Sequence, residues 1–228
     1  MTEFDKLYQE IVRISQSPYH ERIKSRVLYS WNKISPFVHP DDMVVEIGIG
    51  PTSVLAKQLG GAKVIGIDIR NSQSTLCNKF GIDLQICNLE TSPLPLKDES
   101  VDVMLLLEVI EHLCMYPNDL FDEIFKKLKK RGVLVVSTVN FLRFSNRIRV
   151  LLGKSPLINY FERSSDGRNH LREFLPVEMS YYLTKSGFRI MEQHLFGNSE
   201  GRTVTSALLN LAYLYPSFRN YFMVIGKK

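Results

Sequence analysis

The sequence is short of the features that mark several specialised classes of protein. It has three cysteines, Cys77, Cys87 and Cys114, and their spacing gives neither a paired zinc motif nor a disulfide framework. It has no block of like charge, because the excess of Lys and Arg behind the net charge of +5 is spread along the chain. Repeats and low-complexity segments are also missing. We therefore expect a globular protein with reduced thiols in a cytoplasmic compartment.

Long hydrophobic runs are missing too. The first residues, MTEFDKLYQEIVRIS, carry acidic groups at once and lack the apolar stretch of a signal peptide. The longest apolar run near the C-terminus, ALLNLAYLY at 207–215, is too short to span a bilayer but is apolar enough for peripheral membrane contact. With 44% hydrophobic residues among 228, the chain can nevertheless bury the core of one large domain.

What the sequence does contain is an alternation of two periodicities. Short apolar runs alternate with segments at helical spacing, so we predict an α/β fold with right-handed βαβ units and a doubly wound, mostly parallel sheet. The predicted strands are 43–48, 63–69, 83–88, 101–109, 133–139, 188–196 and 220–228. The predicted helices are 3–16, 19–34, 51–60, 71–81, 117–132, 176–187 and 202–215.

The alternation also divides the chain into parts of a single domain. Residues 1–40 are predicted to be a helical cover, and residues 41–140 the α/β core, with a ligand site at the ends of its strands. Residues 141–172 break the pattern and mix aromatic residues with arginines, so we interpret them as a lid or substrate insertion. Residues 173–228 then complete the sheet.

A glycine-containing turn follows the first predicted strand. In VVEIGIGPTS, Glu46 lies at the end of the strand, and Gly48 and Gly50 permit positive φ and the close approach of a ligand. The next strand ends at Asp68, whose carboxylate can accept hydrogen bonds from both ribose hydroxyls of a nucleoside. Ser53 stands where a dinucleotide-binding motif has its last glycine, which leaves a pyrophosphate less room. Ligands of such sheets bind outside the carboxyl ends of the strands.

Several segments in order resemble class I S-adenosylmethionine-dependent methyltransferases. VVEIGIG is similar to the family's first motif, GID to its ribose-binding acidic position, and CNLETSPLPLKDESVDVMLLLEVIEHL to its third and fourth motifs. LKKRGVLVVST resembles the segment around the fifth strand. The resemblance is strong over residues 40–140. It implies a Rossmann-like, seven-stranded sheet whose last strand is antiparallel, with S-adenosylmethionine as the cofactor.

The resemblance also assigns the cofactor-binding residues. Asn88 stands where the family most often has Asp, but its amide oxygen can still accept a hydrogen bond from the adenine amino group. Thr52 stands where the family has Gly. The implied roles are the methionine moiety for Glu46, Gly48 and Gly50, the ribose for Asp68, the adenine for Ile69, Asn88 and Leu89, and a cofactor contact for Glu108.

The stretch LLLEVIEHL places acidic groups after the central predicted strand. If a helical turn starts there, Glu108, Glu111 and His112 share one face. With His170, which follows the predicted lid, they would form a site for Mg²⁺ or Mn²⁺. We predict that Glu111, His112 and His170 are catalytic. The alternative is that Glu111 and His112 only cap a helix while His170 positions the substrate or acts as a general base.

The pattern Glu-x-x-Glu-His with a distant His resembles two branches of the family. One is the metal-dependent small-RNA 2′-O-methyltransferases, and the other is the ubiquinone-biosynthesis type of O-methyltransferase with its relatives acting on glycans and lipids. We predict O-methylation of a small molecule, glycan or lipid precursor. RNA methylation, a non-catalytic cofactor-binding module, and nitrogen or carbon acceptors stay open. The remaining histidines, His20, His39 and His194, are predicted to lie in loops or at the surface.

Overall fold

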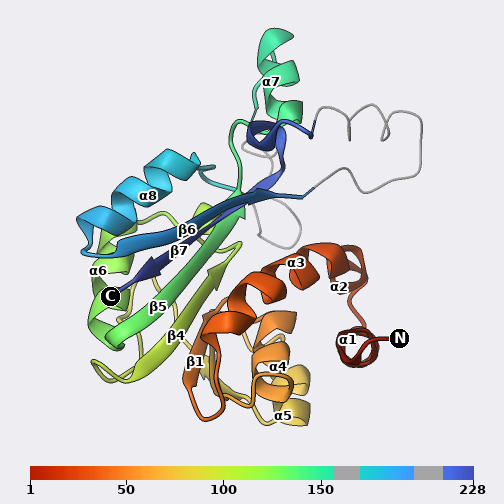
Figure 1. Cartoon of the computed structure of the whole chain (residues 1–228), viewed down its shortest axis with the longest axis vertical. Coiled ribbons are helices and arrows are strands. Elements are labelled where there is room, and N and C mark those ends of the chain that lie inside the picture. Colours follow the sequence, from red (N-terminus) through yellow and green to blue (C-terminus); the bar gives the residue numbers. More distant parts are fainter. Residues whose placement is uncertain (157–169, 198–212) are drawn as a thin grey trace.

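The computed structural model describes residues 1–156, 170–197 and 213–228, and Figure 1 shows their arrangement. One sheet has the strand order β3-β2-β1-β4-β5-β7-β6. Every neighbouring pair is parallel except that β7 runs antiparallel to both β5 and β6. The predicted seven-stranded sheet with an antiparallel last strand is confirmed. The strands are β1 Met43–Ile47, β2 Lys63–Asp68, β3 Asp83–Ile86, β4 Val101–Leu107, β5 Leu128–Val139, β6 Arg189–Phe196 and β7 Tyr221–Lys227.

Helices cover both faces of this sheet (Figure 1). On β4, Val103 and Leu105 face the core shared with α1, α3, α4 and α5, whereas Met104 and Leu106 face the core shared with α6 and α8. A strand buried on both faces needs a continuous apolar run, which explains the sequence MLLL. The α-helices are α1 Glu3–Ser15, α2 Pro18–Arg22, α3 Lys24–Ile34, α4 Pro51–Gln58, α5 Ser74–Phe80, α6 Pro117–Lys127, α7 Phe144–Leu151 and α8 Pro176–Lys185. Short 3₁₀ turns are η1 Ser35–Phe37, η2 Ile110–His112 and η3 Pro216–Phe218.

Two predicted boundaries are wrong. The helix predicted at 19–34 is two helices, α2 and α3, which are separated at Ile23, where ψ is 8° rather than helical. The helix predicted at 117–132 ends at Lys127, and β5 begins five residues before the predicted start of its strand. Leu128 is buried and pairs with Val101 of β4, so tertiary packing overrides the helical propensity of the lysines around it.

Two other predicted segments are described only in part. Within the predicted lid, α7 forms and projects from the body of the protein (Figure 1), while residues 157–169 lie outside the described residues. Most of the helix predicted at 202–215 also lies outside them. In the described part of the chain, no helix combines the length and apolar character needed to cross a membrane.

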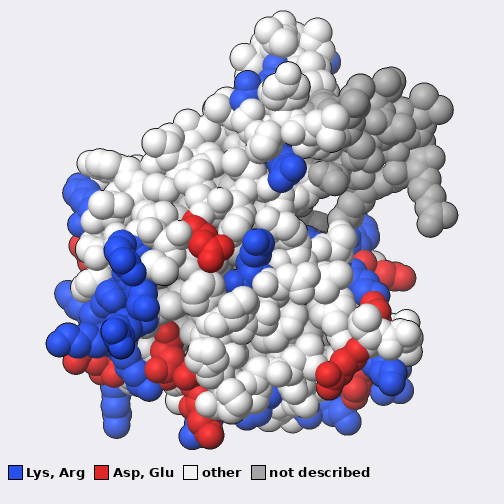
Figure 2. Space-filling model, viewed as in Figure 1, with Lys and Arg blue, Asp and Glu red and all other residues white. Residues whose placement is uncertain are grey.

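Basic residues that are far apart in the sequence gather on one face of the folded protein. The end of β7 pairs with the start of the apolar part of β5, because Lys227 lies opposite Val133 and the Lys228 backbone donates to Gly132. The C-terminal lysines therefore join the basic run 129–131 at the amino-terminal edge of the parallel strands. Figure 2 shows cations gathered on this face near the C-terminus marked in Figure 1. This group lies at the opposite edge of the sheet from the predicted ligand site.

Candidate functional site

Two adjoining cavities lie at the carboxyl ends of β1, β2 and β4. Their volumes are about 320 and 230 Å³, a size that suits small-molecule sites. The position is the one at which doubly wound sheets bind ligands. We call the two together the groove. They share the lining residues Gly48, Asp68, Ile69, Arg70, Val109 and His112.

The turn between β1 and α4 needs glycine at its first position. Gly48 has a φ of +75°, and a Cβ there would lie 2.3 Å from Cγ2 of Val109. Its backbone nitrogen donates to the Ile67 carbonyl at 2.8 Å, which ties the turn to β2. Gly50 then caps the start of α4 in an extended conformation. The backbone of this turn consequently forms a wall of the groove.

Glu46 is a buried carboxylate beneath that turn. Its Oε2 atom accepts hydrogen bonds from the backbone nitrogens of Gly50 at 3.1 Å and Ser53 at 2.9 Å, and from the Ser53 hydroxyl. Burial raises the pKa of Glu46 to about 7, and the nearby Asp68 adds to the rise, although the three hydrogen bonds oppose it. Glu46 therefore titrates near neutral pH.

Replacing Glu46 with glutamine will stabilise the ligand-free protein in a pH-dependent way. Because the folded-state pKa of Glu46 lies above the unfolded-state value near 4.5, the folded protein loses stability as pH rises from about 4.5 to about 7. Glutamine keeps the shape and carries no charge, so its advantage should grow across that window to about 3 kcal/mol at pH 8. Chemical unfolding of both proteins at pH 5 and pH 8 measures it. A difference in unfolding free energy that does not change with pH would contradict the assignment.

The residues after β2 and β3 that were predicted to hold a nucleoside also line the groove. Asp68 accepts backbone hydrogen bonds from Ile49 at 3.2 Å and Arg70 at 3.0 Å, so its carboxylate is held at the groove wall. Ile69 is 58% exposed there, which leaves an apolar surface for a flat ring. Asn88 and Leu89 line the second cavity, and Oδ1 of Asn88 accepts from the Glu90 backbone at 3.1 Å.

Glu108 lines the groove but is not part of a helical turn. Its φ is +56°, and the turn that follows covers only Ile110–His112. Its carboxylate accepts from the Ser137 hydroxyl at 2.9 Å and from Arg26 of α3 at 3.2 Å. The expected common face with Glu111 and His112 does not form, because the left-handed backbone at Glu108 directs the chain out of the helix.

The structure does bring Glu111, His112 and His170 together. One ligand atom of each lies within 4.8 Å of the others, and the two imidazole rings meet edge to face with centroids 5.0 Å apart. The backbone nitrogens of Leu171 and Arg172 donate to the Glu111 carbonyl at 2.8 and 3.2 Å, which holds the segment of His170 beside η2. We call these three residues the Glu111 cluster. It lacks Glu108, which was predicted to join it.

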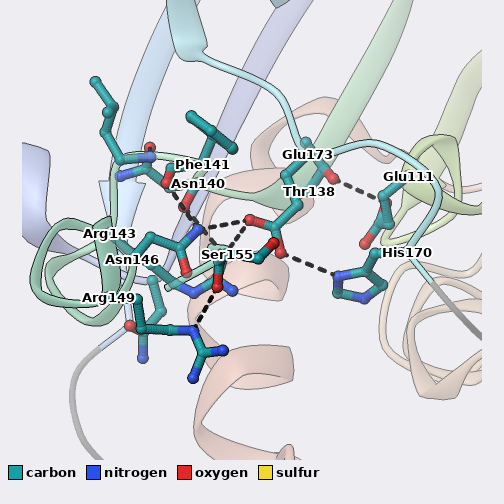
Figure 3. Close-up of polar contacts among 12 residues, drawn as sticks. Glu111, Thr138, Asn140, Phe141, Arg143, Asn146, Arg149, Ser155, His170 and Glu173 are labelled. Carbon is teal, nitrogen blue, oxygen red and sulfur yellow. Dashed lines mark hydrogen bonds and ion pairs between the residues drawn. The ribbon is translucent and has the colours of Figure 1, made fainter. Parts of the chain in front are cut away.

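Within the cluster, Glu111 is fully buried. Thr138 donates to its Oε2 atom at 2.8 Å, whereas Oε1 has no hydrogen-bond partner among the described residues (Figure 3). Burial raises the pKa of Glu111 well above its usual value, and the negative charge of Glu108 adds to this. A buried carboxylate oxygen without a partner is costly. This oxygen, next to two imidazoles, fits a site that receives a cation or a proton.

The prediction missed several residues of the site. Ser137 and Thr138 lie near the carboxyl end of β5, at the same edge of the sheet. The rule that ligands bind at the carboxyl ends of parallel strands could therefore have identified them. No sequence pattern marked Arg26 as a site residue, because it reaches the groove only through the packing of α3. His20, predicted to lie in a loop or at the surface, is buried in α2, contacts the Ser15 hydroxyl at 2.9 Å and lines the groove.

Comparisons with known proteins agree with the fold. Residues 45–136 match the family described as the methyltransferase domain. A probable S-adenosylmethionine-dependent methyltransferase of Mycolicibacterium smegmatis is 34% identical over 132 residues, which are 56% of this chain and 44% of that protein. The chain thus spans less than half the length of this relative.

Solved structures with the same fold cover most of the chain. A SAM-dependent methyltransferase from Archaeoglobus fulgidus aligns with a TM-score of 0.63 and 18% identity, covering 90% of this chain and 94% of that one. One from Mesorhizobium loti aligns with a TM-score of 0.65 and 16% identity, covering 87% and 97%. The similarity to the two solved structures concerns the fold.

Proposed function

We propose that the chain, with a methyltransferase domain at residues 45–136 and the Rossmann-like fold of class I methyltransferases, transfers methyl groups from S-adenosylmethionine. One observation carries the proposal. The glycine turn at Gly48, the carboxylate of Asp68 and the exposed Ile69 line one groove at the carboxyl ends of β1 and β2. They suit, in that order, an amino-acid moiety, a ribose and an adenine.

Cofactor binding is the first test of this proposal. Titration of the protein with S-adenosylhomocysteine in a calorimeter should show one site per chain. NADP⁺ should not compete, because its 2′-phosphate would meet the carboxylate of Asp68. Tight binding of NADP⁺ without binding of S-adenosylhomocysteine would reject a methyltransferase and favour a dehydrogenase.

We propose that the methyl group is transferred to a hydroxyl group. The Glu111 cluster is the feature that supports this choice of acceptor. Methyl transfer from a sulfonium needs an acceptor that is aligned and, for a hydroxyl, deprotonated. His112 lines the groove, so the cluster adjoins the space that the cofactor is proposed to occupy. Its imidazoles and carboxylate can accept the proton of the acceptor and fix the acceptor oxygen.

The residues of the cluster also fit a divalent metal ion. One carboxylate and two imidazoles form a three-ligand set with open positions. Oε1 of Glu111, which has no hydrogen-bond partner in the described part of the chain, is the atom that such an ion would satisfy. When bound, such an ion would lower the pKa of the acceptor hydroxyl. Glu108 is left out of this proposed ligand set, because Arg26 and Ser137 hold its carboxylate.

A small molecule, glycan or lipid precursor is the proposed acceptor, as in the ubiquinone-biosynthesis type of O-methyltransferase. Tyr19, Ile23 and Val27 of the N-terminal helices line the larger cavity, so the groove is covered from that side. A covered groove favours a small or flexible acceptor. Assays with labelled S-adenosylmethionine can compare catechols and glycan hydroxyls with short RNA, and transfer to RNA alone would overturn this choice.

A further inference from the structure

We infer that Glu173 is a positioning residue of the Glu111 cluster, which fixes the imidazole of His170 so that Nε2 is the nitrogen offered to a metal ion. The inference rests on the proposed metal site but concerns a residue outside its ligand set. Figure 3 shows the carboxylate of Glu173 between the ring of His170 on one side and the side chains of Arg143 and Asn146 on the other. Its carboxylate therefore joins the cluster to the neighbouring helix α7.

The carboxylate of Glu173 is buried and has three side-chain partners. Its side chain is 3% exposed. Oε2 accepts hydrogen bonds from Arg143 at 2.5 Å and from the Asn146 amide at 2.9 Å. Oε1 is left to face Nδ1 of His170 at 3.4 Å. Because Oε2 already accepts two hydrogen bonds, Oε1 is the oxygen that can accept one from the His170 ring.

The backbone around Glu173 is fixed on both sides. Before it, Leu171 and Arg172 donate to the Glu111 carbonyl, and after it Phe174 forms a β-bridge with Asn140 at the end of β5. Phe174 also accepts from the Phe141 backbone at 3.0 Å. The segment is thus held between η2 and the end of β5. These backbone bonds keep Glu173 and His170 on neighbouring positions of one fixed segment.

Glu173 is also the acceptor of an ion pair. The guanidinium of Arg143 donates to its Oε2 atom at 2.5 Å, which holds the group as a carboxylate. An ionised carboxylate only accepts hydrogen bonds, so the nitrogen that faces it must carry the proton.

A neutral imidazole has one N–H group and one lone pair. If Nδ1–H donates to Glu173, the lone pair is on Nε2, and this is the nitrogen that would bind the metal ion. Carboxylates that hold a ligating histidine in this way orient the ring and raise its basicity, and their loss commonly costs 10- to 100-fold in metal affinity. No sequence pattern indicates this role, because Glu173 only precedes a predicted helix.

The test is calorimetric titration of Mn²⁺ into the full chain and its Glu173→Gln variant. We expect roughly 10- to 100-fold weaker binding in the variant. Because Glu173 acts through His170, Glu173→Gln should cost nothing further when His170→Ala is already present. Glu192→Gln is the matched control, since it removes the carboxylate from a similar pair with His194 at 2.7 Å on β6. Equal Mn²⁺ affinity in parent and variant, or additive losses in the double variant, would overturn the inference.

A second measurement needs no metal. In ¹⁵N NMR spectra of the parent at alkaline pH, His170 should be the Nδ1–H tautomer, and Glu173→Gln should shift it toward the Nε2–H form. If the parent binds no Mn²⁺, the proposed metal site fails, and the tautomer alone then decides whether Glu173 positions His170. A predominant Nε2–H tautomer in the parent would reject it.

Discussion

The variant Asp68→Ala will bind S-adenosylhomocysteine at least about 100-fold more weakly than the parent protein. Two hydrogen bonds from ribose hydroxyls to an ionised carboxylate contribute about 1.5–3 kcal/mol each, and the variant loses both. The variant also loses the carboxylate that accepts hydrogen bonds from the Ile49 and Arg70 backbone nitrogens. These hydrogen bonds shape the groove wall. Calorimetric titration of the two proteins gives the ratio of their dissociation constants.

The control for this experiment is Asp83→Ala. Asp83 is an exposed carboxylate on the neighbouring strand β3, bonded to the Gln85 amide at 3.0 Å and absent from the groove lining. Its loss should leave the affinity unchanged. An Asp68→Ala protein that binds as tightly as the parent would show that the nucleoside lies elsewhere, and the proposed cofactor site would be rejected.

Removing divalent ions will lower the rate of methyl transfer by on the order of 1,000-fold, once an acceptor has been found. An ion at the Glu111 cluster is proposed to supply several kcal/mol by activating and orienting the acceptor hydroxyl. Adding Mn²⁺ after chelation should restore the parent protein but not the His170→Ala variant. Initial rates with labelled S-adenosylmethionine, before and after EDTA treatment, measure both effects.

The matched control is His194→Ala, which removes a half-buried imidazole that is paired with Glu192 on the edge strand β6. This variant should respond to EDTA and Mn²⁺ as the parent does. Methyl transfer that EDTA does not change would remove the metal from the proposal. Glu111 and the two histidines would then act only on the proton of the acceptor.

The sequence was sufficient to predict the sheet because its strands are buried on both faces. Successive side chains of the run MLLL in β4 point alternately into the two cores, as only a strand allows, and similar apolar runs form β1, β2 and β5. The carboxyl ends of parallel strands meet at one edge, so the same reasoning placed Asp68 and Asn88 in one groove. His170 was predicted from a pattern, and backbone hydrogen bonds to Glu111 bring it there.

Contacts between distant segments could not be predicted in this way. Arg26 reaches Glu108 across 82 positions of sequence, and only the packing of α3 over the groove brings them to 3.2 Å. Glu173 depends on the place of α7, which no periodicity reveals. The left-handed backbone at Glu108 was missed for a local reason, because a non-glycine residue rarely adopts positive φ.

A crystal structure of the protein grown with S-adenosylhomocysteine and Mn²⁺ tests the central claim most directly. We predict an anomalous difference peak for manganese among Glu111, His112 and His170. The nucleoside should lie against Asp68 and Ile69, with its sulfur atom on the side of the peak. Cofactor density outside the groove, or an anomalous map without a peak at the cluster, would contradict the account.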